Sequence, residues 1–456
     1  MRTIKLSEAE TWAPDPAAVP VTAKTRSGTF AIRGNGTQTC CGGWQFAFTG
    51  IRGGEGYRIR ASVRHGGLQN PRDCLQAIAY WDKWDPAQTS SGSTPWNYLL
   101  PLAKSQRLMS FECACRAPDG AKRLTVRYIF RWSSEGVSTW TAPDVEGVEI
   151  PHRRPVRVCV VSATRQTKDR MQIQRFSDGL GLPEDVAGAV DLWASLARAA
   201  CRRKPQLIVM PELVISGRRS LQGAVEVPGP ATAPFEKIAR DHNVHLVVGM
   251  QERERDAVYN SAVLFSPSRG VHGVYRKVHL ATAEDLTGVR PGDSFPVFDT
   301  PIGRIGCLIC MDTTVCESAR MTALNGAEFI CFPIMGDLRA DRYSIGQPVY
   351  NEGRWKAIMR TRAIDNQVCM VVARNDVQGS CIISRKGDIL AWNEGDQEII
   401  EATVPMEDGY YAWNGGDFRE ITYMLRRPHL YGAYTDDACL GPLRAGKGGT
   451  GASGDV

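Results

Sequence analysis

Three reactive or charged residues stand at the ends of short apolar runs: Glu212 in LIVMPE, Lys277 in VYRKVHL and Cys310 in RIGCLICMD. A cysteine thiol is mostly protonated at neutral pH, so a nucleophilic cysteine needs a base or a nearby positive charge. A carboxylate that follows a buried strand is partly desolvated, which suits a general base. A buried lysine pairs with carboxylates, and both Glu212 and Glu284 would be partners for Lys277. These residue types fit thiol chemistry, although each taken alone also fits a solvated loop or strand face.

The stretch RIGCLICMDTTVCESAR (304–320) holds three of the fourteen cysteines, two of them spaced as Cys307-x-x-Cys310. We predict a strand that ends at Cys310. Residues i and i+3 of a strand point to opposite faces, so these two thiols cannot easily pair or share a metal ion. Cys316 begins the next expected helix, where packing is its plain role. With seven histidines, no second CxxC and no HExxH, the sequence predicts no metal site.

Short apolar runs alternate with amphipathic helical stretches from residue 157 onward, as in EFICFPIM before GRWKAIMRTRAIDN. Strands this apolar are buried on both faces, so the pattern predicts a layered α/β domain with its site at the carboxyl ends of strands. Before residue 150, period-two alternation predicts an all-β sandwich with these strands: 29–34, 43–51, 56–65, 75–84, 108–118 and 123–132. We therefore expect a β-sandwich domain (1–150), an α/β domain (155–440) and a disordered Gly- and Ser-rich tail (441–456).

Composition narrows the classes of partner. Lys plus Arg number 55 against 49 Asp plus Glu, and the net charge of +6 is spread along the chain without a basic block. Nucleic acid is therefore not expected as a partner. The N-terminal stretch lacks the apolar region of a secretory signal, and no run of about eighteen apolar residues occurs, so we expect no membrane association and a cytoplasmic protein. Many cysteines lie inside apolar runs such as RVCVV, so no disulfide framework is expected.

In their order along the chain, LIVMPE, YRKVHLATAE and IGCLICMD resemble the signature segments of the nitrilase superfamily of carbon-nitrogen hydrolases. The resemblance continues through ARMTALNGAEFICFPI and covers about residues 155–435. It implies an α/β fold, a four-layer αββα sandwich, and assigns roles by position. Cys310 would be the nucleophile, Glu212 the general base and Lys277 the cation near the oxyanion. Glu284 would match an additional site glutamate that orients the substrate or assists proton transfer.

The resemblance implies hydrolysis of a non-peptide carbon-nitrogen bond, amide or N-carbamoyl (ureido), through a cysteine thioester. Ammonia or an amine would be released, and no cofactor would be needed. The backbone N–H of Met311 would join Lys277 in holding the oxyanion. The nitrile-cleaving branch usually shows Cys-Trp-Glu, which is absent here. Many members carry Phe-Pro-Glu a few positions after the nucleophile, where this chain has Val315-Cys316-Glu317. Amidase or carbamoylase activity is therefore favoured over nitrilase activity, with acyl transfer or a non-catalytic binding protein as alternatives.

The segment MGDLRADRYSIGQP (335–348) would form the wall of the substrate pocket in this family. Its Asp337, Arg339 and Arg342 would select a charged end of the substrate. An exposed charged loop is the more common role for such residues.

The first domain resembles a galactose-binding-like jelly roll, on the segments CCGGWQFAFTGIRGGEGYRIRASVR and SFECACRAPDGAKRLTVRYIFRW. A carbohydrate partner would stack on its indole rings, although such rings more often fill a sandwich core. The tryptophans concerned are Trp44, Trp81, Trp84, Trp96, Trp132 and Trp140. The superfamily resemblance also implies a homo-oligomer, in which we expect DFREITYMLRRPHLYG (417–432) to dock on a partner subunit.

Overall fold

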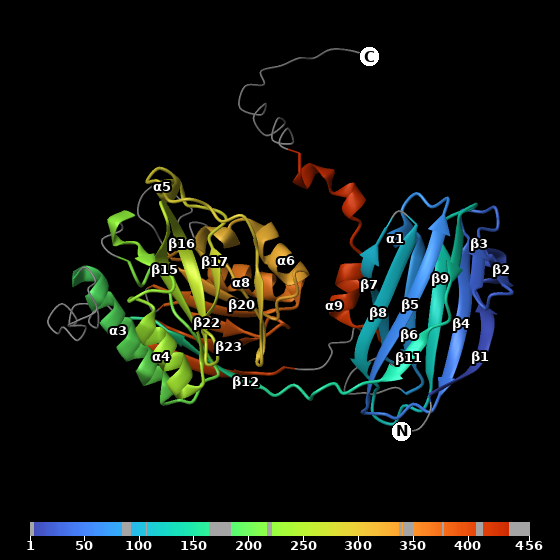
Figure 1. Ribbon diagram of the computed structural model, residues 1–456, viewed down its shortest axis with the longest axis horizontal. Coiled ribbons are helices and arrows are strands. Elements are labelled where there is room, and N and C mark those ends of the chain that lie inside the picture. The colour runs from blue at the N-terminus through green and yellow to red at the C-terminus, as the bar shows by residue number, and fades with distance from the viewer. Residues whose placement is uncertain are drawn as a thin grey trace, which may run out of the picture. The chain divides into compact units, whose positions relative to one another are not determined.

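The computed structural model describes residues 4–83, 93–105, 107–163, 184–216, 221–336, 340, 350–375, 378–406 and 414–436. By its contacts the chain divides into two compact units, residues 1–152 with 408–456 and residues 153–407. Strands dominate the first unit, whereas strands and helices alternate along the second (Figure 1). The second unit is therefore of the α/β class, and it follows a sheet-rich N-terminal region.

The strands of the first unit join into one hydrogen-bonded path, β1-β4-β9-β6-β7-β8-β5-β10-β3-β2, with β11 paired to β5. β7 pairs with β6 on one side and β8 on the other, and the inward side chains of both halves share one core. The strands are β1 (Lys5–Trp12), β2 (Val21–Lys24), β3 (Phe30–Arg33), β4 (Cys41–Thr49), β5 (Gly56–Gly66), β6 (Leu75–Trp81), β7 (Trp96–Lys104), β8 (Leu108–Arg116), β9 (Leu124–Arg131), β10 (Val137–Trp140) and β11 (Asp144–Gly147). A short helix, α1 (Pro71–Cys74), precedes β6.

The C-terminal helix α9 (Phe418–Met424) belongs to the first unit by its contacts with β7. Glu420 accepts hydrogen bonds from Tyr98 N at 2.8 Å and Asn97 Nδ2 at 3.2 Å. Met424 joins an apolar cluster that includes Ile78, Tyr98 and Ile129. We expected residues 417–432 inside the α/β domain, whereas α9 packs on β7 of the chain's own first unit. Docking of this segment on a partner subunit stays a prediction.

Two sheets form the second unit. The first has the order β17-β16-β15-β13-β12-β24 with β14 paired to β15, and the second has the order β18-β19-β20-β21-β22-β23. The first comprises β12 (Val156–Val161), β13 (Leu207–Val209), β14 (Val225–Glu226), β15 (His245–Glu254), β16 (Ala257–Ser266), β17 (Gly270–Arg276) and β24 (Ile399–Val404). The second comprises β18 (Val297–Thr300), β19 (Gly303–Cys307), β20 (Phe329–Ile334), β21 (Cys369–Arg374), β22 (Cys381–Ile383) and β23 (Ile389–Trp392). In each sheet three neighbouring strands run parallel, so their carboxyl ends share an edge.

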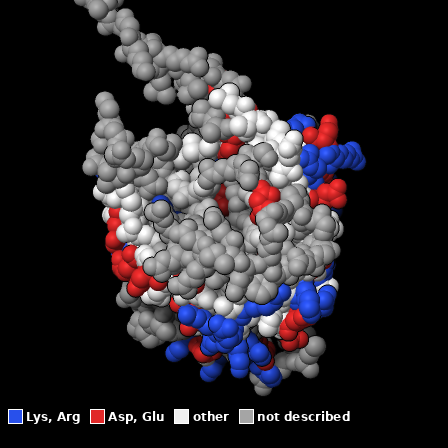
Figure 2. All heavy atoms as spheres, turned by 90° about the vertical axis from the view of Figure 1, so that its left-hand side faces the viewer, with Lys and Arg blue, Asp and Glu red and all other residues white. Residues whose placement is uncertain are grey.

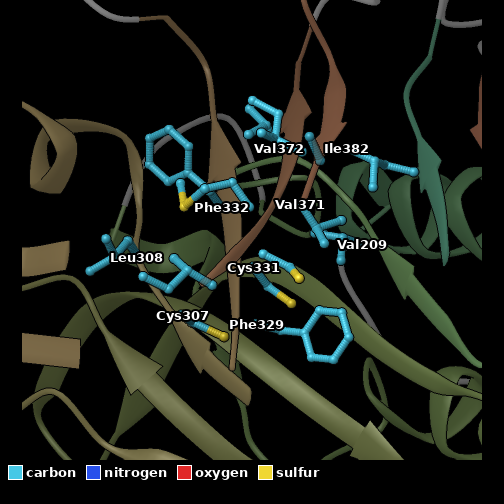
Figure 3. Close-up of a cluster of buried hydrophobic side chains, with 14 of the residues drawn as sticks. Val209, Cys307, Leu308, Phe329, Cys331, Phe332, Val371, Val372 and Ile382 are labelled. Atoms are coloured by element: carbon cyan, nitrogen blue, oxygen red, sulfur yellow. The ribbon is translucent and has the colours of Figure 1, made fainter. Parts of the chain in front are cut away.

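Each sheet of the second unit buries side chains on both faces. Helices α3 (Glu184–Cys201) and α4 (Ala233–His242) contact the first sheet, and α6 (Cys316–Leu324) and α8 (Glu352–Asn366) contact the second. The two sheets share a core in which Val209 of β13 lies near Val371 and Cys331 of the other sheet (Figure 3). Along β12, Val158 belongs to that core while its neighbour Cys159 packs with the residues of α3, as a period of two requires.

Charges of both signs share the surface. In Figure 2, Lys and Arg side chains gather at the lower edge of the face shown, with Asp and Glu among them. Exposed basic residues cluster at the C-terminal end of α3, where they favour the helix dipole: Arg198, Arg202, Arg203 and Lys204. Within the described ranges, no helix has both the length and the apolar character needed to cross a bilayer. Every cysteine in that part of the chain is a free thiol.

Candidate active site

Four side chains singled out in the sequence come together where strands of the two sheets end. Glu212 follows β13, Lys277 follows β17 directly, and Cys310 opens a short 3-10 helix, η3 (Cys310–Thr313), after β19. Glu284 lies in α5 (Thr282–Asp285), which follows the Lys277 segment. Because the strands converge at this edge, residues far apart in the sequence share one cluster.

Lys277 is the centre of the cluster, with only 1% of its surface exposed. Its Nζ donates to Glu212 Oε1 at 2.8 Å and to Glu284 Oε2 at 2.6 Å. Burial alone lowers the pKa of Lys277, but the negative charges around it outweigh burial and hold that pKa above its ordinary value. These charges belong to Glu212, Glu284 and the thiolate form of Cys310. Lys277 is therefore a fixed cation between two carboxylates.

Glu212 is buried, and both of its carboxylate oxygens accept hydrogen bonds. Oε1 accepts from Lys277 Nζ and, at 2.8 Å, from Asn260 Nδ2 of β16. Oε2 accepts from Met335 N at 3.0 Å, just beyond β20. The next residue, Leu213, has a φ of 53°, a left-handed conformation that is uncommon outside glycine. The carboxylate is thus held by groups from both sheets.

Cys310 also has a left-handed backbone, with a φ of 43°, and its thiol donates to Gly336 O at 3.3 Å. Met335 N and Gly336 O therefore join the end of β20 to both Glu212 and Cys310. Burial, followed by the charge of Glu212, raises the pKa of the Cys310 thiol to about 12, against the opposing charge of Lys277. The resting thiol is protonated at neutral pH, so nucleophilic attack requires a base.

The strand before Cys310 is shorter than we predicted. β19 ends at Cys307, which lies opposite Cys331 of β20 in the buried core. The chain then turns into η3 at Cys310, where the left-handed backbone breaks the period of two. The expectation of a strand through Cys310 is therefore wrong, and both cysteines are free thiols.

Asp312 is fully buried two residues after Cys310 and connects two parts of the site. Its Oδ2 accepts from Ile309 N at 2.8 Å and from Tyr275 OH at 2.6 Å. Its Oδ1 accepts from His279 N at 3.0 Å and lies 2.9 Å from His279 Nδ1. Burial raises the pKa of Tyr275 well above its ordinary value, and the charge of Asp312 adds to the increase, so the phenol remains a donor. Since Tyr275 and His279 flank Lys277, Asp312 ties the lysine segment to the cysteine turn.

The other residues named from the sequence have different positions. Asp337, Arg339 and Arg342 lie outside the described residues. The N–H of Met311 precedes the first hydrogen bond of η3, from Asp312 N to Ile309 O at 3.0 Å, so it has no acceptor within that helix. Cys316, expected to pack, is exposed, and its thiol contacts Glu317 Oε2 at 3.3 Å because it starts the helix on its outer side. Among the side chains that the structure describes, no cluster of three His, Cys, Asp or Glu suits a metal ion.

Half of the tryptophans considered for sugar stacking fill the core of the first unit: Trp44, Trp81 and Trp140. Trp96 is half-buried and donates from Nε1 to Asn414 O at 3.0 Å. Trp132 is 51% exposed, but the guanidinium of Arg131 covers its ring at 3.8 Å. Trp84 lies outside the described residues. The three buried rings serve packing and offer no face to a ligand.

Sequence reasoning missed four residues of the site: Asn260, Tyr275, His279 and Asp312. Each carries a sequence signal, because a polar residue inside a run destined for burial needs a partner. Asn260 interrupts the strand AVYNSAVLF, and the other three lie within two residues of Lys277 or Cys310. The signal marks the residue but not the partner, which comes from a distant strand.

Comparison with known proteins adds an independent result. A family model for carbon-nitrogen hydrolase matches residues 171–412. A nitrilase of Pyrococcus abyssi is 39% identical over 228 residues, which cover 46% of this chain and 81% of the relative. The omega-amidase NIT2 of Homo sapiens is 26% identical over 234 residues, which cover 47% of this chain and 81% of the relative. The solved structure of an amidase from Nesterenkonia sp. aligns with a TM-score of 0.47 and 19% identity, over 63% of this chain and 99% of that chain.

Proposed function

The chain belongs to the carbon-nitrogen hydrolases of the nitrilase superfamily, and from this premise we propose that it cleaves an amide or N-carbamoyl (ureido) bond through a thioester on Cys310. The observation that carries the proposal is the cluster around Lys277, where one buried ammonium contacts two carboxylates beside a protonated thiol. Such a cluster supplies a base, a cation and a nucleophile within one buried site.

In the first half of the reaction, Glu212 takes the proton of the Cys310 thiol as sulfur attacks the carbonyl carbon. The carbon-sulfur bond forms, and the π electrons of the carbonyl move onto its oxygen. Lys277 and the N–H of Met311 are the groups that we assign to this oxyanion. Protonated Glu212 then gives its proton to the leaving nitrogen, the carbon-nitrogen bond breaks, and ammonia or an amine departs.

In the second half, Glu212 takes a proton from a water molecule that attacks the thioester. The new carbon-oxygen bond replaces the carbon-sulfur bond, and the thiolate regains a proton from Glu212. The sum is one water consumed, with one acid and one amine or ammonia released. We assign Glu284 to the orientation of the substrate, since it shares Lys277 with Glu212 and its side chain is 17% exposed.

Nitrile hydrolysis is a second candidate, because the relative of 39% identity is called a nitrilase. Attack of the same thiol on a nitrile carbon gives a thioimidate, which two waters convert to acid and ammonia. Acyl transfer to an amine from the same thioester, and ligand binding without turnover, are the remaining alternatives. The products separate these activities.

The test measures ammonia and amine release from small amides, N-carbamoyl amino acids, ureido amines and nitriles. Wild type is compared with Cys310→Ala and with Cys316→Ala, which removes an exposed thiol outside the cluster. We expect turnover of an amide or ureido compound that Cys310→Ala abolishes and Cys316→Ala preserves. Silence across the panel, with no adduct on Cys310 by intact-mass spectrometry, would reject the hydrolase proposal in favour of a binding protein.

We further propose that the two sheets with α3, α4, α6 and α8 form a four-layer αββα sandwich, and that the first unit is a jelly roll. The alternating burial along β12 and the single core of the first unit support these assignments. A homo-oligomer and a cytoplasmic location remain predictions. Light scattering tests the former, and a monomer at working concentration would contradict it.

A further inference from the structure

Asn260 stands on β16 beside the residue that carries the site cation. The backbone oxygen of Asn260 accepts from Lys277 N at 2.8 Å, so the two residues share a fixed register. The side-chain amide is 1% exposed and donates from Nδ2 to Glu212 Oε1 at 2.8 Å and to Glu284 Oε1 at 2.6 Å. The amide nitrogen of Asn260 therefore donates to the same two carboxylates that accept hydrogen bonds from Lys277.

The orientation of this amide follows from the charges around it. Its oxygen, Oδ1, is buried and has no hydrogen-bond partner among the described residues. Turning the amide over would place that oxygen against two carboxylate oxygens, all of them acceptors. Hydrogen bonds to charged groups are the stronger ones, so the amide keeps both N–H groups on the carboxylates and leaves its own oxygen unpaired. The two hydrogen bonds to carboxylates therefore determine the orientation of the Asn260 side chain.

We propose that Asn260 is a positioning residue that sets the spacing and the proton acceptors of Glu212 and Glu284 around Lys277. An amide N–H can only donate, so the oxygens that face it must accept, and Lys277 occupies the same oxygen of Glu212. The oxygen left for the thiol proton is then Oε2, which Met335 N holds near the Cys310 turn. The role of this geometry in turnover rests on the proposed function.

Four variants separate positioning from folding. Asn260→Asp has the same shape but replaces the donor by an acceptor, Asn260→Ser keeps one donor, and Asn260→Ala keeps none. The control is Asn366→Asp in α8, because Asn366 is also buried, also has an unpaired oxygen among the described residues, and donates to Arg362 O outside the cluster.

The first readout is kcat and KM on the substrate found in the panel. We expect kcat to fall about 100-fold in Asn260→Asp and Asn260→Ala and about 10-fold in Asn260→Ser, with KM changed less than about threefold. The pH–rate profile should change in Asn260→Ala, because both carboxylates lose a hydrogen-bond donor. Asn366→Asp should keep kcat and the pH profile, even where its melting temperature falls.

The second readout needs no substrate and is the rate at which iodoacetamide alkylates Cys310. It is followed by peptide mass mapping, because the exposed thiol of Cys316 also reacts. We expect this rate at pH 8 to fall about 10-fold in Asn260→Asp, because a further carboxylate opposes removal of the thiol proton. If wild type is silent in the panel but this change occurs, the proposed function fails and the positioning role stands. Asn260→Asp with wild-type alkylation, or with kcat losses no larger than those of Asn366→Asp, would overturn the positioning role.

Discussion

Gly249 in β15 is the position where a single methyl group should disturb the site most directly. A Cβ built on Gly249 would lie 2.3 Å from Pro211 O, 2.8 Å from Glu212 Cα and 2.9 Å from Leu213 N. All three atoms are backbone, so no side-chain rotation relieves the contact. β15 cannot withdraw, because β13 and β16 pair with it on its two sides. Gly249→Ala must therefore displace the turn that carries Glu212.

The size of the displacement follows from these distances. An ordinary carbon-oxygen contact is about 3.4 Å, so the Pro211–Leu213 turn must move by about 1 Å. Overpacking of this kind costs about 1–3 kcal/mol of folding free energy. A misplacement of about 1 Å in a reacting group can cost about 100-fold in rate, so we expect kcat of Gly249→Ala to fall about 10- to 100-fold.

The assay compares kcat, KM and melting temperature of Gly249→Ala with those of wild type and Gly188→Ala. Nothing lies within 4 Å of a Cβ built on Gly188 in α3, so that variant should keep its activity and gain about 0.5–1 kcal/mol of stability. Rates are normalised to the folded fraction obtained from the thermal unfolding curve, which removes unfolded molecules. Wild-type kcat in a folded Gly249→Ala protein would refute the close approach as a constraint on Glu212.

Four further predictions concern the charged groups of the site. Because the pKa of Cys310 is raised to about 12, its alkylation rate should rise about tenfold per pH unit from pH 7 to 9 without a plateau; a plateau below pH 9 would show a thiolate at rest. Glu212→Gln removes a charge that raises this pKa, so it should alkylate faster than wild type at pH 8 while losing turnover, and slower alkylation would contradict the assigned charge effect. Asp312→Asn replaces a carboxylate oxygen by an NH2 group, which turns a donor toward buried donors, and should lower stability by about 2–4 kcal/mol in urea unfolding. Tyr275→Phe, which removes one of those donors, should cost about 1 kcal/mol, and equal losses would contradict the network. Lys277→Met leaves Glu212 and Glu284 without their cation and should abolish turnover and lower the melting temperature in differential scanning fluorimetry. An unchanged melting temperature would contradict a stabilising role of this cation.

The sequence was most informative where residue pattern and local geometry agree. The alternation of apolar runs and amphipathic helices in the second unit matches β12, α3, β13, α4, β19, α6, β20 and α8 in that order. The six strands expected in the first unit correspond to β3, β4, β5, β6, β8 and β9. β1 escaped prediction because it is exposed along most of its length, so KLSEAETW lacks an apolar alternation. β10 and β11, of four residues each, were also not predicted.

Some features of the site could likewise be predicted from the local sequence, and others could not. Glu212, Lys277 and Cys310 were visible because reactive residues at strand ends carry a local signal. The turn at Cys310 was not visible, because a left-handed backbone at cysteine runs against its own preference and is set by the surroundings. The placement of α9 on the first unit likewise depends on an apolar cluster built from strands that are distant in the sequence.

Hydrogen bonds to acidic side chains hold the strained backbone of two turns at this site. Leu213 and Cys310 both hold left-handed conformations, each of which costs about 1–3 kcal/mol for a residue other than glycine. Such conformations persist only where the surroundings fix the backbone on either side. Asp312 does this for the cysteine turn by accepting from Ile309 N, and Glu212 does so for its own turn by accepting from Met335 N. Both groups are acidic side chains that accept backbone N–H groups. The carboxylate of Glu212, which we assign as the base, therefore also holds a strained turn of the site.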